Sequence, residues 1–408
     1  MRTAVLYLPA ASHPLTACAR SSQVLTQFRR LMRDESRIPE RPRSAQRVIF
    51  IDLARAIAVI LMVAGHTSSA LLAKSYQSGQ WFVVWTFQRG LTSALFLLLA
   101  GFAFSIATTR HWTTHLALSP PVLKRARRFA MFVVLGYALH LPTRPIWNLT
   151  TVTEPQWRAL LGVDVLQLIG TTLLLVQALV LVCRSRRVFT VVSFAIAIAI
   201  VAASPLMWRT DWTRVMPLPL AAYLSPGTGS LFPLFPWTAY VLIGAATGQV
   251  YARWGAAHLG AFARWGMLLP GAALLVLGSR LLSDVPSDVA LRTGSCFLVM
   301  GAIALLSQRI SQLPHVFGAV AQESLLVYFV HLCIVYGSVW NPGLYRVFGE
   351  RLSPPAALGF VAAVVIPMIA LAWYWNRLKH VRPAAARWVS VAAGVVLGGL
   401  LLWPDVLR

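Results

Sequence analysis

The chain has 408 residues, of which 58% are hydrophobic and only 12% are charged, and its formal net charge is +24. A soluble domain carries about 25% charged residues, so this composition excludes an ordinary soluble protein. The positive charge does not indicate nucleic-acid binding, because the basic residues form short clusters between apolar segments, as the positive-inside rule predicts for a membrane protein.

Apolar segments long enough to cross roughly 30 Å of hydrocarbon recur along the chain. We therefore predict an all-α, polytopic integral membrane protein with about 10 to 11 transmembrane helices in one bundle. The predicted spans, in chain order, are residues 48–73, 82–107, 129–142, 160–183, 188–207, 236–252, 265–283, 289–307, 320–340, 355–376 and 388–404.

The basic clusters also predict the orientation of the spans. Residues 1–46 are expected to form a basic, disordered cytoplasmic tail, because arginines are frequent there ahead of the first span. The chain then returns to the cytoplasm at Lys124, Arg125, Arg127 and Arg128. The four cysteines are scattered and have no metal-ligand spacing, so no metal site is predicted.

The first span carries three ionisable residues, Asp52, Arg55 and His66. Such residues are costly in hydrocarbon and mark functional sites by default. At about 100° per residue, steps of three and eleven residues place all three on one helical face, with Arg55 and His66 roughly 16 Å apart along the axis. The face has a charged end and an imidazole end. The alternative to a role in binding is that Asp52 and Arg55 form a structural ion pair that holds the span in position.

Other polar residues in apolar segments are further candidates. His331 lies in the ninth span, with Tyr328 one turn before it, while Gln167 and Asp164 mark the fourth span. Arg89 in the second span is expected either to face an acceptor or to extend its side chain to the membrane–water interface. His140 suits a position at that interface.

Five segments resemble the heparan-alpha-glucosaminide N-acetyltransferase catalytic-domain family, which is related to the acyltransferase-3 membrane enzymes. The segments follow the family's order between residues 48 and 340. They are Asp52 to His66, Leu99 to Phe102, Val165 to Gly170, Phe235 to Gly248, and Glu323 to His331. Residues 47–408 are accordingly predicted to form one membrane acyltransferase-like domain.

The resemblance implies transfer of an acyl group, usually acetyl, from cytoplasmic acyl-CoA to an acceptor at the far face of the membrane. It also implies a histidine in the outer loop after the first span. That loop, residues 67–80, contains no histidine, so the role passes to His66 at the helix end. Imidazole suits the role of base or acyl carrier, because its pKa lies near neutrality.

We therefore predict a multi-pass acyltransferase of the bacterial inner membrane, with a cytoplasmic N-terminus, acting on a glycan or other cell-envelope acceptor. His66 and His331 are the predicted catalytic residues. The donor is acyl-CoA, and the lipid bilayer and a small-molecule or glycan acceptor are the expected partners; homo-oligomerisation is left open. A transporter of a small solute, whose polar residues line a pathway, is the alternative. The predicted substrate- and donor-binding residues are Asp52, Arg55, Arg89, Lys124, Arg125, Arg128, Gln167 and Tyr328.

Overall fold

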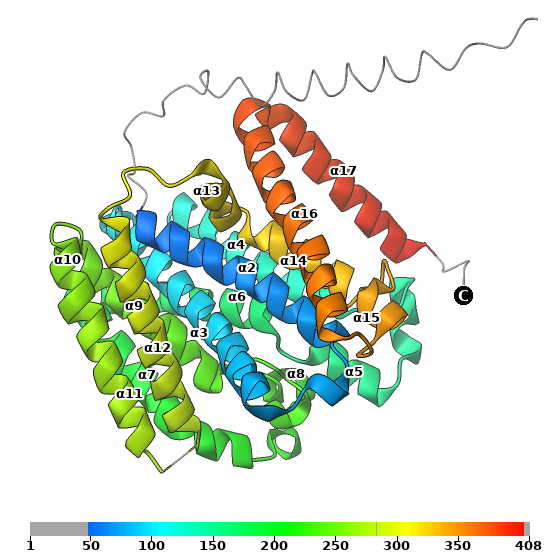
Figure 1. The fold of residues 1–408 in the computed structure, drawn as a ribbon, viewed down its shortest axis with the longest axis horizontal. Helices are drawn as coiled ribbons and strands as arrows, with labels where there is room; N and C mark the ends of the chain where they lie inside the picture. The colour runs from blue at the N-terminus through cyan, green and yellow to red at the C-terminus, as the bar shows by residue number, and fades with distance from the viewer. Residues whose placement is uncertain (1–47, 283, 404–408) are drawn as a thin grey trace, which may run out of the picture. The chain divides into compact units, whose positions relative to one another are not determined.

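The structure is a computed structural model, which describes residues 48–282 and 284–403; the tail predicted at residues 1–46 lies outside this range. All regular elements of the described residues are helical (Figure 1). The α-helices are α2 (Ile49–Leu71), α3 (Gly79–Thr109), α4 (Pro120–Leu139), α5 (Glu154–Leu161), α6 (Val165–Cys183), α7 (Arg186–Arg209), α8 (Leu218–Ala221), α9 (Leu234–Val250), α10 (Leu259–Ala261), α11 (Leu269–Arg280), α12 (Asp284–Ser307), α13 (His315–Gln322), α14 (Ser324–Val335), α15 (Gly343–Phe348), α16 (Pro354–Val381) and α17 (Pro383–Leu402).

The prediction of an all-α polytopic membrane protein is confirmed. Within the described residues, eight helices are long and apolar enough to cross a bilayer, or nine if the bent pair α13 and α14 forms one span. The two remaining predicted spans correspond to α4 and α9. The first half of α4 carries four basic residues, and α9 has only 17 residues. Both form helices, but α4 is less apolar and α9 is shorter than these eight helices.

Helix α2 lies inside the bundle and contacts α3, α12, α13, α14 and α16. Phe50, Ile51 and Ala54 belong to the larger apolar core, which α3, α6 and α9 share. Val59, Val63 and Leu71 belong to a second core, formed with α14 and α16. Because apolar side chains pack around α2, its position is determined by both cores, and so is the position of His66 near its C-terminal end.

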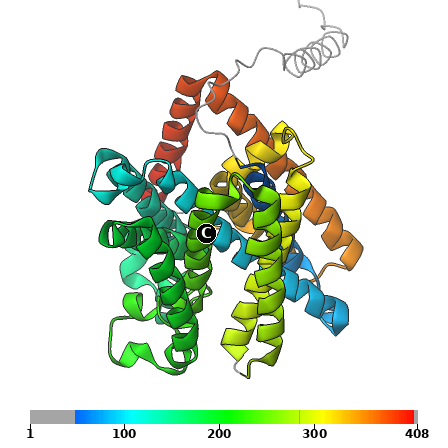
Figure 2. The same cartoon turned by 90° about the vertical axis from the view of Figure 1, so that its left-hand side faces the viewer.

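Small residues allow α3 and α9 to approach closely. A Cβ atom on Gly101 would overlap the carbonyl oxygen of Val241, and one on Gly244 would overlap that of Leu98. The Ser105 hydroxyl donates to the Ala245 carbonyl oxygen at 2.6 Å. Such contacts are typical of membrane helices, where packing and interhelical hydrogen bonds replace the hydrophobic effect. Helices α11 and α12 also run side by side (Figure 2), with Gly271 and Gly294 facing each other.

The helical segment that carries His331 is broken. Helices α13 and α14 meet at an angle of 73° next to Glu323. Further along the chain, backbone hydrogen bonds join the end of α2 to the segment before α16: Leu352 N–H donates to Leu71 at 2.9 Å, and Ala73 N–H donates to Leu352 at 2.9 Å. These contacts hold the C-terminal end of α2 against the second half of the chain.

Candidate active site

A cavity of about 750 Å³ lies at the C-terminal end of α2 and contains the largest group of predicted site residues. Its walls come from α2, α3, α4, α6, α9, α12 and α14 and from the segment around residue 231. The polar and aromatic residues of its lining are His66, Thr86, Arg89, Thr92, Ser93, Phe96, His140, Asp164, Phe232, Trp237, Arg292, Tyr328 and Tyr336. An apolar cavity with a few convergent polar groups is the usual form of a ligand site.

His66 and His331 form a hydrogen-bonded pair at this cavity. Nδ1 of His66 lies 2.8 Å from Nε2 of His331, and the two rings are nearly parallel, with an interplanar angle of 8°. His331 is fully buried, and its Nδ1 lies 2.8 Å from the Val327 carbonyl oxygen.

The hydrogen bonds determine which nitrogen of each neutral ring carries the proton. A carbonyl oxygen only accepts, so Nδ1 of His331 is the donor and its Nε2 is an acceptor. Nδ1 of His66 must then donate to Nε2 of His331. This leaves Nε2 of His66 without a proton, with its lone pair available as a base or nucleophile.

Tyr328 connects the histidine pair to a second polar group. Its ring packs edge-on against His331, with centroids 5.6 Å apart, and its hydroxyl lies 3.5 Å from Oδ2 of Asp164. Oδ1 of Asp164 accepts from the Val165 N–H at 2.7 Å and so caps the N-terminus of α6. Nε2 of His140 lies 3.7 Å from Oδ2 of Asp164.

Two arginines complete the polar lining. The stem of Arg89 passes over Gly65, where a Cβ atom would lie 3.4 Å from Cγ of Arg89. No hydrogen bond or ion pair joins Arg89 to another side chain of the described residues. Arg292, by contrast, contacts both carboxylate oxygens of Asp288, at 2.8 and 2.6 Å, and lies over the Phe87 ring.

The other two ionisable residues of the first span lie away from the cavity. Asp52 and Arg55 precede His66 by 14 and 11 residues on the same helix, about 21 and 16 Å along its axis. Both are half-buried, and both take part in interactions within the bundle. The structure thus separates these two residues from the imidazole end of α2.

The predicted donor-binding residues of α4 lie near its N-terminal end, while Leu139 at the opposite end of α4 lines the cavity. Lys124 and Arg128 are exposed. Arg125 is half-buried: it donates to the Thr108 hydroxyl at 2.7 Å and lies over the Phe104 ring. Burial, and then the charge of Arg125, lower the pKa of the neighbouring His115.

Gln167 also lies outside the cavity lining. It is fully buried, and its amide packs where a side chain on Gly136 would otherwise lie, between α6 and α4. Neither amide atom has a hydrogen-bond partner among the described residues.

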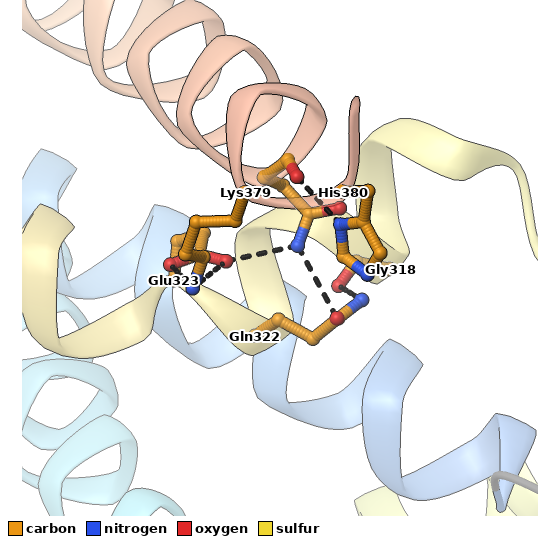
Figure 3. A network of polar contacts seen from close by, with 6 residues as sticks. Gly318, Gln322, Glu323, Lys379 and His380 are labelled. Atoms are coloured by element: carbon orange, nitrogen blue, oxygen red, sulfur yellow. Dashed lines mark hydrogen bonds and ion pairs between the residues drawn. The ribbon is translucent and has the colours of Figure 1, made fainter. Parts of the chain in front are cut away.

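A separate polar network lies at the break between α13 and α14 (Figure 3). Glu323 accepts from Lys379 at 2.6 Å and from the Asn376 amide at 2.8 Å, and the Asn376 amide also donates to Gln322. The Glu323 side chain is only 5% exposed, whereas that of Lys379 is 42% exposed. The network joins the break to the C-terminal end of α16, and none of these four residues lines the cavity that contains His66.

Arg292 and Tyr336 are among the cavity residues that were not predicted as site residues. Arg292 follows Asp288 by four residues, which is the spacing of an ion pair on one helix. In sequence, this spacing resembles that of an ion pair on a helix surface, so it did not indicate a cavity residue. Tyr336 packs edge-on against His66, with ring centroids 5.8 Å apart. An aromatic residue at the end of an apolar span is usual in any membrane protein, so no signal distinguished it.

Comparison with known proteins agrees with the family resemblance. The sequence profile described as "Heparan-alpha-glucosaminide N-acetyltransferase, catalytic" matches residues 47–283, more than half of the chain. His66 and Arg89 lie within the matched residues, whereas Tyr328 and His331 lie beyond them. A comparison with curated proteins found no match. The predicted family is therefore confirmed: the chain belongs to the heparan-alpha-glucosaminide N-acetyltransferase catalytic-domain family and is a multi-pass membrane acyltransferase.

Proposed function

We propose that this protein moves an acyl group, acetyl as the first candidate, from cytoplasmic acyl-CoA to a glycan or another cell-envelope acceptor, and that His66 is the centre of the reaction. The observation that carries the proposal is the hydrogen bond between His66 and His331, which leaves Nε2 of His66 unprotonated at a cavity of about 750 Å³. The family favours this function over the transporter alternative.

The proposed step has two forms that use the same atom. In the first, Nε2 of His66 takes the proton of the acceptor's amine or hydroxyl as that group attacks the thioester carbonyl; the C–S bond breaks, and the proton passes to the CoA thiolate. In the second, Nε2 attacks the thioester carbonyl, the C–S bond breaks and CoA thiolate leaves. The acceptor then attacks the acyl group on Nε2, the N–acyl bond breaks, and the acceptor's proton passes to the CoA thiolate. In both, the hydrogen bond to His331 stabilises the positive charge that develops on the His66 ring.

Arg89 is placed to stabilise the negative charge of the reacting carbonyl. It shares the cavity with His66, crosses the neighbouring Gly65, and has no carboxylate partner among the described residues. A preorganised cation in a site with little water stabilises a developing oxyanion more than it would in solution.

We assign the donor to the opposite end of α2. The basic N-terminal half of α4, with Lys124, Arg125 and Arg128, suits the phosphates of CoA, and Asp52 and Arg55 lie on the way to His66. This assignment places the N-terminus in the cytoplasm and the cavity toward the outer face of a bacterial inner membrane. It agrees with the distribution of basic residues.

The test is complementation of a deletion strain with wild type, His66→Gln or His258→Gln, followed by mass spectrometry of the envelope glycans. His258 is exposed and lies outside the cavity lining, so it is the matched control. We expect wild type and His258→Gln to restore an added acyl mass and His66→Gln to fail at equal membrane abundance. Full restoration by His66→Gln would remove His66 from the mechanism. The added mass identifies both acyl group and acceptor.

A further inference from the structure

The cavity at the C-terminal end of α2 continues onto an apolar surface of α3. Thr86, Arg89 and Ser93 of α3 line the cavity. Phe82 precedes Thr86 by four residues, so it lies on the same side of the helix, one turn nearer the N-terminus. Phe82 is half-buried, and its neighbour Val83 is 67% exposed. The cavity wall that α3 provides therefore leads to side chains at the surface of the bundle.

Three apolar side chains at this end of α3, namely Phe82, Val83 and Phe87, are called here the α3 strip. Val83 and Phe87 are four residues apart and therefore adjacent on the helix, and Phe87 is 37% exposed. Helix α3 is long and apolar enough to span a bilayer, which places the strip where hydrocarbon chains can cover it. The strip thus offers an apolar chain a path that ends at the cavity.

A guanidinium group lies where the α3 strip meets the cavity. Arg292 on α12 lines the cavity and lies over the ring of Phe87. Both carboxylate oxygens of Asp288 contact its Nε, at 2.8 and 2.6 Å. Nη1 makes only a long contact, of 3.5 Å, with the Phe87 carbonyl oxygen, and Nη2 has no hydrogen-bond partner among the described residues. The guanidinium group is therefore held at Nε, while its two terminal nitrogens remain available as donors.

A cation beside an apolar strip fits a ligand that carries a phosphate on a long apolar chain. The two terminal nitrogens of a guanidinium group match two oxygens of a phosphate. The Arg292 side chain is only 17% exposed, so salt screens its attraction for an anion weakly. A soluble anion would use Arg292 and leave the strip uncovered, whereas a neutral lipid would cover the strip and leave Arg292 without an anion. A phosphate joined to an apolar chain uses both.

We propose that the acyl acceptor is anchored in the membrane through a phosphate on a long apolar chain. The phosphate binds Nη1 and Nη2 of Arg292, the chain lies along Phe82, Val83 and Phe87, and the head group extends into the cavity toward His66. This inference rests on the proposed function, because it names the class of acceptor that the same cavity takes.

The chain offers a matched control for each half of the proposal. Arg292→Gln removes the guanidinium group, and Arg280→Gln removes an exposed one at the end of α11, outside the cavity lining. Val83→Gln places a polar group in the α3 strip, and Val276→Gln does so on α11, where the valine is 64% exposed. The double variant Asp288→Asn with Arg292→Gln keeps a hydrogen-bonding pair on α12, so it separates a loss of binding from a loss of folding.

The first measurement is thermal stabilisation of the purified proteins, in an uncharged detergent, by decyl phosphate, butyl phosphate or decyl glucoside. We expect decyl phosphate alone to stabilise wild type, Arg280→Gln, Val276→Gln and His66→Gln. The apparent Kd for decyl phosphate should rise by about tenfold or more in Arg292→Gln and in the double variant, the effect of losing a charged hydrogen bond. It should rise less in Val83→Gln, which loses only part of the apolar contact.

Several outcomes of this measurement contradict the anchored acceptor. The assignment is wrong if decyl phosphate leaves wild type unchanged, or if Arg292→Gln and the double variant bind it as wild type does. Equal stabilisation by butyl phosphate would indicate a soluble anion as the ligand, and equal stabilisation by decyl glucoside would indicate unspecific binding of amphiphiles. A Val83→Gln protein that binds like Val276→Gln would show that the chain does not lie on the α3 strip.

The second measurement is CoA release from acetyl-CoA with two acceptors that share one sugar. One is glucosamine, and the other carries decyl phosphate on the anomeric carbon of glucosamine. We expect the KM of wild type to be about tenfold or more lower for the anchored sugar, and Arg292→Gln to lose most of this difference. Equal KM values in wild type contradict the anchored acceptor. A His66→Gln protein that binds decyl phosphate and also transfers at the wild-type rate contradicts the proposed function while leaving the Arg292 subsite intact, so the two failures are distinguishable.

Discussion

Gly90 on α3 leaves the space that the guanidinium group of Arg292 on α12 occupies. A Cβ atom at position 90 would overlap Nη1 of Arg292, which is held there by Asp288 and by the Phe87 ring. The absence of a side chain on α3 thus allows an arginine of another helix to reach the cavity wall.

We expect Gly90→Ala to destabilise the protein by about 1–3 kcal/mol, the usual cost of overpacking a well-filled site. Thermal unfolding in detergent is the measurement. The double variant Gly90→Ala with Arg292→Ala should recover part of the loss, because the overlapping group is removed. No recovery would show that Arg292 is not the source of the cost. Gly359→Ala is the control, because a Cβ atom there meets no atom within 4 Å.

Replacing His331 should reduce turnover more than acceptor binding. His331→Leu removes the acceptor of the His66 Nδ1 proton, and we expect kcat to fall by about 100-fold, a typical loss for acid–base catalysis. His331→Gln, which retains a polar group, should recover part of this activity. Steady-state kinetics with glucosamine as acceptor are the measurement. A loss of kcat that follows only the loss of folded protein would indicate a structural role.

The Glu323–Lys379 pair should stabilise the break between α13 and α14. We expect Lys379→Met to cost about 1–3 kcal/mol of unfolding free energy, because the buried Glu323 carboxylate loses a charged hydrogen bond while keeping the one from Asn376. Glu323→Gln in the Lys379→Met background should recover stability. A double-mutant cycle with additive effects would show that the two side chains do not interact.

The glycine contact between α3 and α9 should tolerate no side chain. Gly244→Ala places a methyl group against the Leu98 carbonyl, so we expect a lower melting temperature, with a loss of about 1–3 kcal/mol. Gly394→Ala on α17 is the matched control, because its Cβ atom would meet nothing within 4 Å, and this variant should unfold as wild type does. Equal melting temperatures for both variants would contradict the role of Gly244 in close packing.

The basic N-terminal half of α4 should control affinity for the donor. For Lys124→Gln with Arg128→Gln, both of which are exposed, we expect a higher KM for acetyl-CoA and a weaker dependence of that KM on ionic strength. The KM for glucosamine should not change. Kinetics between 50 and about 500 mM salt are the measurement. If the KM of wild type and variant depends equally on salt, these residues determine the orientation of the chain in the membrane and do not bind the donor.

Local patterns in the sequence were sufficient to predict the helices and their membrane character. Apolar segments of the length of a bilayer identified α2, α3 and α6 directly. The break at Glu323 was missed, because no Pro or Gly marks it and its polar partners Asn376 and Lys379 come from another helix. Gly101 and Gly244 were identified in the sequence only as parts of family-like segments. The structure shows what they do, because both allow α3 to pack closely against α9.

The geometry of the candidate site could be predicted only in part. The helical spacing placed Asp52, Arg55 and His66 on one face, but it could not show that the cavity includes His66 and not the other two. The pairing of His66 with His331 joins residues 265 positions apart, and that of Tyr328 with Asp164 spans 164 positions. Periodicity reports neighbours on one helix, whereas contacts between distant helices depend on how the whole bundle packs.

The distance in sequence between His66 and His331 has a consequence for how the protein is made. Helix α2 leaves the ribosome before α14, because 265 residues separate His66 from His331 along the chain. The imidazole of α2 therefore acquires its hydrogen-bond partner late in biogenesis, so a partly inserted chain contains His66 without the neighbour that sets its protonation. The proposed reaction at His66 thus requires that α14 has assembled against α2.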